Sequence, residues 1–222
     1  MESLILAPSW FSTVDYAFEV FSLLTTIFVA YYSYRVYRYT DQPKYRTMAG
    51  AFLLIALSFG LKVLTELGIR TQVAEMGGIQ TLAQVMQVST ALQTGYFAMR
   101  LFMLLGLVLL LKLAFNIENR RLLFLLAFFS VMVTVMSHSS YYAFHIAAAL
   151  MLGFIVEFLY HNFRKKRSRP AGFVLSSFGM LFLAQLCFVF TAQSAKLYPI
   201  GETAQLVGFL LLIINHVLVL RR

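Results

Sequence analysis

Long apolar runs, separated by short polar segments, make up most of the chain. A helix that crosses a membrane needs roughly 20 predominantly apolar residues, whereas a helix of a soluble bundle shows a polar face. Runs such as Leu101–Leu111 and Leu122–Met136 have no such face. The pattern therefore predicts an all-α polytopic membrane protein with seven transmembrane helices. They are expected at Val14–Arg35, Met48–Leu67, Leu82–Phe115, Leu122–Met136, Tyr141–Phe163, Ala171–Ala192 and Ala204–Leu220.

The whole chain, residues 1–222, is predicted to form one transmembrane domain. Residues 14–115 are expected to hold three helices, residues 122–136 a short linker helix, and residues 141–220 three more. The first turns of the third helix are polar and are expected to protrude. Residues 1–13 lack a basic segment and a small-residue cleavage site, so they are interpreted as an interfacial lead-in anchored by Trp10, not as a signal peptide.

The composition supports the membrane prediction. Hydrophobic residues make up 60% of the chain and charged residues 12%, and the mean hydropathy is +0.79. Soluble domains carry about 45–50% apolar and about 25% charged residues, so this chain has too little charge to cover a water-facing surface. The single cysteine, Cys187, excludes a disulfide within the chain.

The positive charges indicate an orientation, because Lys and Arg in short loops favour the cytoplasmic side. Fourteen of the 18 basic residues fall in segments expected on one side of the membrane. They are Arg35, Arg38, Lys44, Arg46, Lys112, Arg120, Arg121, Arg164, Lys165, Lys166, Arg167, Arg169, Arg221 and Arg222. The opposite side holds only Arg70 and Lys196. The N-terminus is therefore expected outside the cell membrane and the C-terminus in the cytoplasm, which requires an odd number of spans.

The first and fifth predicted helices align without gaps, which suggests an internal repeat. Tyr16–Glu19 matches Tyr142–His145, so Glu19 and His145 would occupy corresponding places. The second and sixth helices also align, with small gaps. The repeat would have a parallel 3+1+3 organisation, although the abundance of Phe, Ala and Leu makes a chance match the open alternative.

Seven spans, an N-terminus outside and a 3+1+3 repeat together resemble the broad transporter–opsin–receptor architecture. Two segments, Tyr31–Thr40 and Ala51–Phe59, also resemble prokaryotic multi-helix membrane sensor modules that precede kinases or cyclases. These resemblances imply a receptor, sensor or transporter. A retinal Schiff base would need a lysine in the last helix, and Ala204–Leu220 contains none, so no retinal cofactor is expected.

Ionisable side chains within the predicted spans are candidate functional residues, because they are costly there unless paired or solvated. The candidates lie in the half expected to face outward. As ligand-binding residues we consider Asp15, Glu19, Lys62, Glu66, Gln93, Arg100, His138 and His145.

Asp15 and Glu19 lie one helical turn apart, which is unfavourable for two negative charges without a nearby cation. Glu19 is therefore expected to contact Lys62 or Arg100 across a helix interface. Such a contact could be a dry pair that sets helix register, or it could line a water-filled pocket open to the outside.

A second polar group is predicted in the inner half. Glu157 and His161 lie one turn apart on the fifth helix, and His216 lies near the inner end of the seventh. A carboxylate and two imidazoles can ligate a transition metal. The absence of a closely spaced third ligand favours contact of Glu157 and His161 with headgroups and cytoplasm, so the metal stays an open question.

The leading functional hypothesis is a seven-helix receptor, sensor or regulatory subunit with an outward-facing polar pocket. The alternatives are a transporter or channel for a small polar or ionic solute, and a metal-dependent intramembrane enzyme. The chain has no P-loop, G-x-S-x-G, H-E-x-x-H or C-x-x-C motif, so an enzyme is the weakest of the three. Expected partners are the bilayer, anionic lipids at the cytoplasmic run Arg164–Arg169, and a membrane or cytoplasmic protein, with no nucleic acid.

Overall fold

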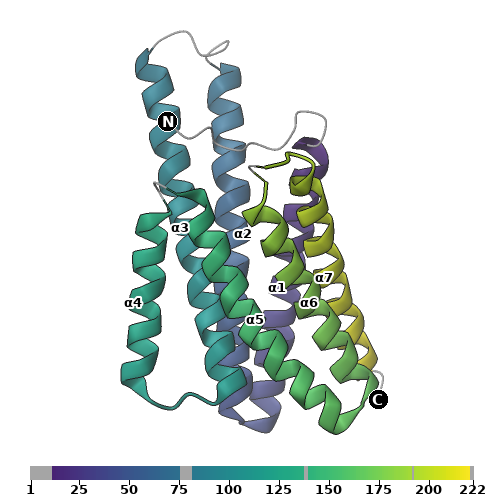
Figure 1. The fold of residues 1–222 in the computed structure, drawn as a ribbon. Helices are drawn as coiled ribbons and strands as arrows, with labels where there is room; N and C mark the ends of the chain where they lie inside the picture. Colours follow the sequence, from purple (N-terminus) through teal and green to yellow (C-terminus); the bar gives the residue numbers. More distant parts are fainter. Residues whose placement is uncertain (1–11, 76–81, 138–139, 192, 221–222) are drawn as a thin grey trace.

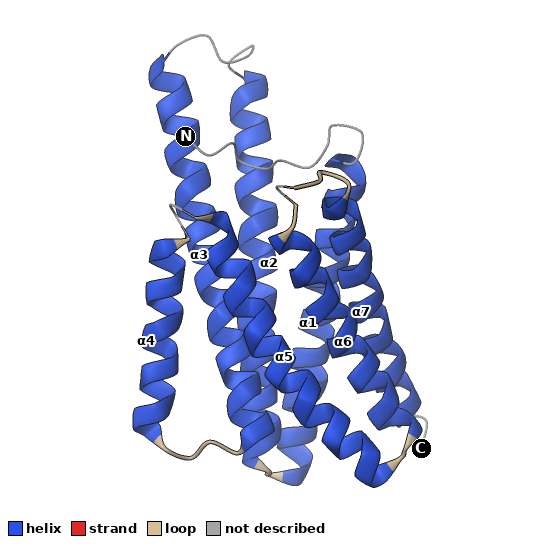
Figure 2. Cartoon of the chain, viewed as in Figure 1, coloured by secondary structure: helices blue, strands red, loops and turns tan. Residues whose placement is uncertain are grey.

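The computed structural model describes residues 12–75, 82–137, 140–191 and 193–220, and their regular secondary structure consists of seven helices (Figures 1 and 2). The helices are α1 (Ser12–Thr40), α2 (Pro43–Glu75), α3 (Leu82–Phe115), α4 (Arg120–Met136), α5 (Tyr141–Lys166), α6 (Arg169–Val189) and α7 (Leu197–Leu220). Each predicted apolar run lies almost wholly within one helix, which confirms the all-α prediction. The lead-in expected at residues 1–13 lies almost wholly outside the described residues.

The start of α7 differs from the predicted start at Ala204. The helix begins at Leu197, so Tyr198 and Glu202 lie inside it. The segment before Ala204 contains Pro199 and Gly201, which are residue types common in loops. A proline in the first turn costs no helical hydrogen bond, however, because the N–H groups there have no intrahelical partner.

Three connections lie at the lower end of the bundle in Figure 1, and each turns through a residue in the left-handed conformation. These residues are Asp41 between α1 and α2, Asn116 between α3 and α4, and Arg167 between α5 and α6, with φ of 51°, 49° and 43°. The N–H groups of Asp41 and Arg167 each donate to a carbonyl four residues back, at 2.8 Å. These caps end the helices sharply and allow the next helix to return antiparallel.

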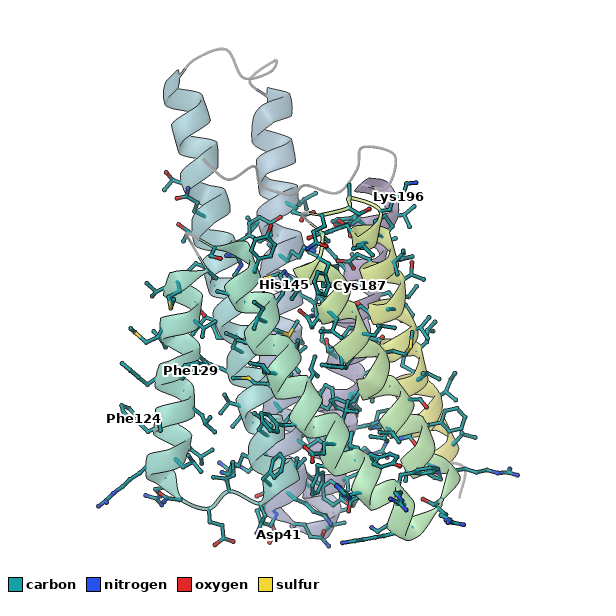
Figure 3. The ribbon with its side chains drawn as sticks, in the orientation of Figure 1. Asp41, Phe124, Phe129, His145, Cys187 and Lys196 are labelled. Atoms are coloured by element: carbon teal, nitrogen blue, oxygen red, sulfur yellow. The ribbon has the colours of Figure 1, made fainter. Side chains whose placement is uncertain are left out.

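Six of the helices form a closed ring. The contacting pairs are α1–α2, α2–α3, α3–α5, α5–α6, α6–α7 and α7–α1, whereas α4 packs outside the ring against α3 and α5. Phe124 and Phe129 of α4 project away from the bundle (Figure 3). The two halves thus share the contact order expected of a 3+1+3 repeat, and the repeat itself stays a prediction that superposition of α1–α3 on α5–α7 would test.

The main apolar core fills the ring. It includes Phe52, Leu104, Ala148, Phe178 and Phe209, and it draws on all seven helices. Two glycines let the backbone of a neighbouring helix approach closely. A Cβ on Gly106 would lie 3.0 Å from the carbonyl oxygen of Ala51, and one on Gly208 would lie 3.1 Å from that of Ser177. Small residues at such positions let helix backbones pack closely in membranes.

Among the described residues, six helices are long and apolar enough to cross a membrane. The exception is α4, whose 17 residues fall short of the roughly 20 that a span requires. The seven-span count therefore stays a prediction for α4. At the end of the bundle that carries Lys196, α2 and α3 extend beyond the other helices (Figures 1 and 3), as expected for the polar first turns of the third helix. We call this end the Lys196 end and the opposite one the Asp41 end.

Candidate functional site

Lys62 of α2 is the centre of a buried polar cluster near the Lys196 end. Its Nζ forms an ion pair with Oε1 of Glu19 on α1. The same Nζ lies 3.9 Å from Oε1 of Glu202 on α7. The expected contact between Glu19 and Lys62 is therefore confirmed, and Glu202 joins it because α7 begins earlier than predicted.

A second contact joins α1 to α7 in the same region. The hydroxyl of Tyr198 donates to Oδ2 of Asp15 at 2.9 Å. We call Asp15, Glu19, Lys62, Tyr198 and Glu202 the Lys62 cluster. All five side chains are buried, so they exchange contacts with one another rather than with bulk water.

The helical period of α1 brings these groups to the cluster. Asp15, Glu19, Ser22 and Thr26 follow one another at intervals of four, three and four residues, and therefore share one face. The hydroxyls of Ser22 and Thr26 donate to carbonyls one turn back, at 2.8 Å each. The hydrogen-bond donors of both hydroxyls are therefore satisfied within α1. The carboxylates are the groups of this face that need partners from other helices.

The Lys62 cluster contains more negative than positive groups. Asp15, Glu19 and Glu202 are 4%, 0% and 3% exposed, and the cation paired with them is Lys62. Oδ1 of Asp15 and Oε2 of Glu19 are buried without a hydrogen-bond partner among the described residues. Buried acceptors usually have a partner, so these two oxygens mark a place where protons, water or a ligand would be stabilised.

Glu66 lies one turn from Lys62 on α2, at the edge of the cluster. It is half-buried, and its Oε1 accepts from the hydroxyl of Tyr96 on α3 at 3.0 Å. Because Glu66 is partly exposed, water can hydrate its carboxylate, whereas the carboxylates of Glu19 and Glu202 are buried.

His145 of α5 lies in the upper part of the bundle in Figure 3, toward the Lys196 end. It is buried, and its Nδ1 donates to the amide Oε1 of Gln185 on α6 at 2.8 Å. The rings of Phe144 and Phe188 lie 4.9 and 5.2 Å from its imidazole. The structure therefore places His145 in a neutral pair with aromatic neighbours.

Arg100 of α3 contacts the end of α4. Its Nη1 donates to the carbonyl oxygen of Ser137 at 2.6 Å and to the Ser137 hydroxyl at 3.0 Å. Its guanidinium also lies 5.9 Å from the centre of the Phe144 ring. Of the two cations expected near Glu19, only Lys62 forms an ion pair with it, because α3 and α1 are not neighbours in the ring.

The remaining predicted residues lie apart from the cluster or beyond the described residues. Gln93 is exposed on α3, and His138 lies outside the described residues. Glu157 and His161 are exposed on α5, whereas His216 of α7 packs against α1 beside the rings of Phe28 and Tyr32. Within the described ranges, no three His, Cys, Asp or Glu side chains come together as metal ligands would.

Three residues of the site are not evident from the sequence pattern. Tyr198 and Glu202 lie next to Pro199 and Gly201, residue types common in loops, so the early start of α7 is not evident. Gln185 is an uncharged residue within an apolar run. The spacing of Tyr198, Glu202 and Gln205 by four and three residues is the one signal that could have extended the helix.

Comparisons with protein-family models, with curated proteins and with solved structures found no significant match to this chain. The functional argument therefore depends on the site itself.

Proposed function

We propose that this chain is a multi-pass cell-membrane protein that acts as a receptor or sensor, with the Lys62 cluster as its ligand-binding centre. The proposal orients the Lys196 end outward, because the described basic loops gather at the Asp41 end and Lys and Arg favour the cytoplasmic side. The observation that carries the proposal is the imbalance of one ammonium among three buried carboxylates, since unbalanced ionisable groups within spans mark functional sites.

The remainder of the ring interior favours sensing over transport. Apolar side chains such as Val29, Phe52, Leu104, Leu152 and Leu212 pack between the cluster and the Asp41 end. A site that communicates with one side only is what a receptor needs. The basic Asp41 end would bind anionic lipids and pass the signal to a membrane or cytoplasmic partner.

A second candidate function is transport of a small cation, and one observation favours it. The buried polar face of α1 continues past the core to Ser33, whose hydroxyl is buried without a hydrogen-bond partner among the described residues. A path along this face would connect the Lys62 cluster with the Asp41 end if the apolar side chains between them moved.

Cysteine accessibility distinguishes the two candidates. In a Cys187→Ala background, Ser22→Cys places a thiol one turn below Glu19 on the same face of α1. Because Ser22 is buried, the reagent reaches this cysteine only while the cluster is open. A receptor predicts that an impermeant thiol reagent then modifies it from outside intact cells and not in sealed inside-out vesicles. Modification from both sides would contradict the receptor proposal and support the transporter.

Matched controls test the orientation of the chain and the absence of reaction at a lipid-facing position. Lys196→Cys should react from outside and Lys44→Cys only in inside-out vesicles. Ile27→Cys, on the exposed side of α1, should react in neither preparation, because a thiol in lipid stays un-ionised. Labelling of Lys44→Cys on intact cells would contradict the proposed orientation.

A further inference from the structure

The geometry of the Lys62 cluster points to Glu202 as a proton-binding group, and we propose that the ligand of this site is the proton. The inference rests on the same cluster as the proposed function and names its ligand. In the resting state Glu202 carries the proton, Glu19 is ionised and paired with Lys62, and Asp15 accepts from Tyr198.

The first step of the argument is charge balance. Asp15, Glu19 and Glu202 are all at least nine-tenths buried, and their cation partner is Lys62. Three ionised carboxylates and one ammonium would leave two negative charges in a region of low dielectric. Burial of charge without compensation is costly, and a carboxylate in this position takes up a proton instead.

The second step concerns the alternative of a metal ion. A bound cation would also supply the missing positive charge, but Ca²⁺ takes six to eight oxygen ligands and Mg²⁺ six. In the described part of the chain the acidic groups are too dispersed for three of them to ligate one ion. A proton needs only one oxygen, so it fits the observed spacing.

The third step selects Glu202 among the three acids. Lys62 forms its close ion pair with Glu19, and Asp15 receives the hydroxyl of Tyr198. Glu202 meets the same ammonium only at 3.9 Å, the outer limit of an ion pair. It has the weakest compensation and is therefore the group that gains most from protonation.

The charged groups that face Glu202 from neighbouring helices belong to two of them, α1 and α2. Asp15 and Glu19 face it from α1, and Lys62 and Glu66 from α2. From α6, the other neighbour of α7, the ring of Phe188 lies 5.8 Å from Tyr198, and it carries no charge. Three like charges therefore oppose ionisation of Glu202, and one ammonium favours it.

Release of the proton from Glu202 would change the contacts between α1, α2 and α7. The departing proton passes to water at the Lys196 end, and the new carboxylate competes with Glu19 for the ammonium of Lys62. The ion pair joining α1 to α2 weakens while the attraction between α2 and α7 strengthens. This exchange converts an outside change of pH into a shift of α7, which is the step a sensor requires.

Infrared spectroscopy of the purified protein in lipid nanodiscs tests the proposal. At neutral pH the wild-type protein should show the C=O stretch of a protonated carboxyl, with the downward shift in D₂O that marks an exchangeable proton. Glu202→Gln should abolish the band. Glu19→Gln should also abolish it, because Lys62 is then free to stabilise an ionised Glu202.

Lys62→Met should act in the opposite direction and add a second band, because Glu19 then protonates as well. Glu157→Gln, which removes an exposed carboxylate of α5, is the matched control and should leave the spectrum unchanged. Wild-type protein without the band would overturn the proposal, and so would a band that survives in Glu202→Gln. Saturable stabilisation by Na⁺ or Ca²⁺ in place of the band would assign the site to a metal cation.

The infrared experiment tests the proton site and the accessibility experiment tests the receptor function, so either proposal can fail without the other. A band that behaves as described, together with labelling of Ser22→Cys from both sides, would retain Glu202 as a proton site and assign it to a transporter. Absence of the band with labelling from outside alone would retain a receptor with another ligand.

Discussion

Two buried polar pairs join the first helix of each half of the ring to the second, and they differ in chemistry. In the first half, Glu19 of α1 pairs with Lys62 of α2. In the second half, His145 of α5 pairs with Gln185 of α6. The predicted repeat would put Glu19 and His145 in corresponding positions, and on that prediction the comparison contrasts a charged pair with a neutral one.

The difference shows that a buried charged pair draws in polar groups from additional helices. The hydrogen bond of the His145–Gln185 pair lies beside the aromatic rings of Phe144 and Phe188. The Lys62 ammonium attracts further acids, and the cluster therefore reaches Glu202 and Tyr198 of α7. The charged pair links the two halves through the α1–α7 contact, whereas the hydrogen bond of His145 to Gln185 joins α5 to α6.

The largest effect is expected from Lys62→Met. Removal of one partner from a buried ion pair costs about 3–5 kcal/mol, and at neutral pH the mutant should lose roughly this much stability toward thermal unfolding in detergent. The loss should shrink at mildly acidic pH, because the carboxylates can then protonate. The double mutant Lys62→Met/Glu19→Gln should recover part of it. A small loss that does not change with pH would show that water already solvates the cluster.

A smaller effect is expected from Gln185→Leu, which removes the acceptor of the His145 proton. A buried donor left without its partner costs about 1–3 kcal/mol. The loss should be the same at neutral and alkaline pH, because an amide does not titrate. If this loss changed between neutral and alkaline pH, the contrast between the charged and the neutral pair would be wrong.

The smallest effect is expected from the two tyrosines. Tyr198→Phe removes a hydrogen bond to buried Asp15 and should cost about 1 kcal/mol. Tyr96→Phe removes the matching bond to half-buried Glu66 and should cost less, because water can replace the hydroxyl there. Thermal unfolding of the two single mutants side by side checks the order, and equal losses would indicate that Asp15 is hydrated.

Part of the site follows from local sequence rules. The spacing on α1 predicts that Asp15 and Glu19 share a face, and the need for a cation predicts a contact of Glu19 with Lys62 or Arg100. The choice between the two cations does not follow from sequence, because it depends on which helices are neighbours in the ring. Arg100 lies on α3, away from α1, and contacts Ser137 instead.

The sequence by itself determined the apolar helices, the polar face of α1 and the gathering of basic residues in alternate connections, because each depends on length, period or composition along a continuous segment. Only the tertiary structure decided that α7 begins at Leu197 and brings Glu202 to Lys62, and that His145 meets Gln185. These contacts join residues that are far apart in the chain. Their energy comes from the scarcity of water inside the ring, where a charge must find its partner on another helix.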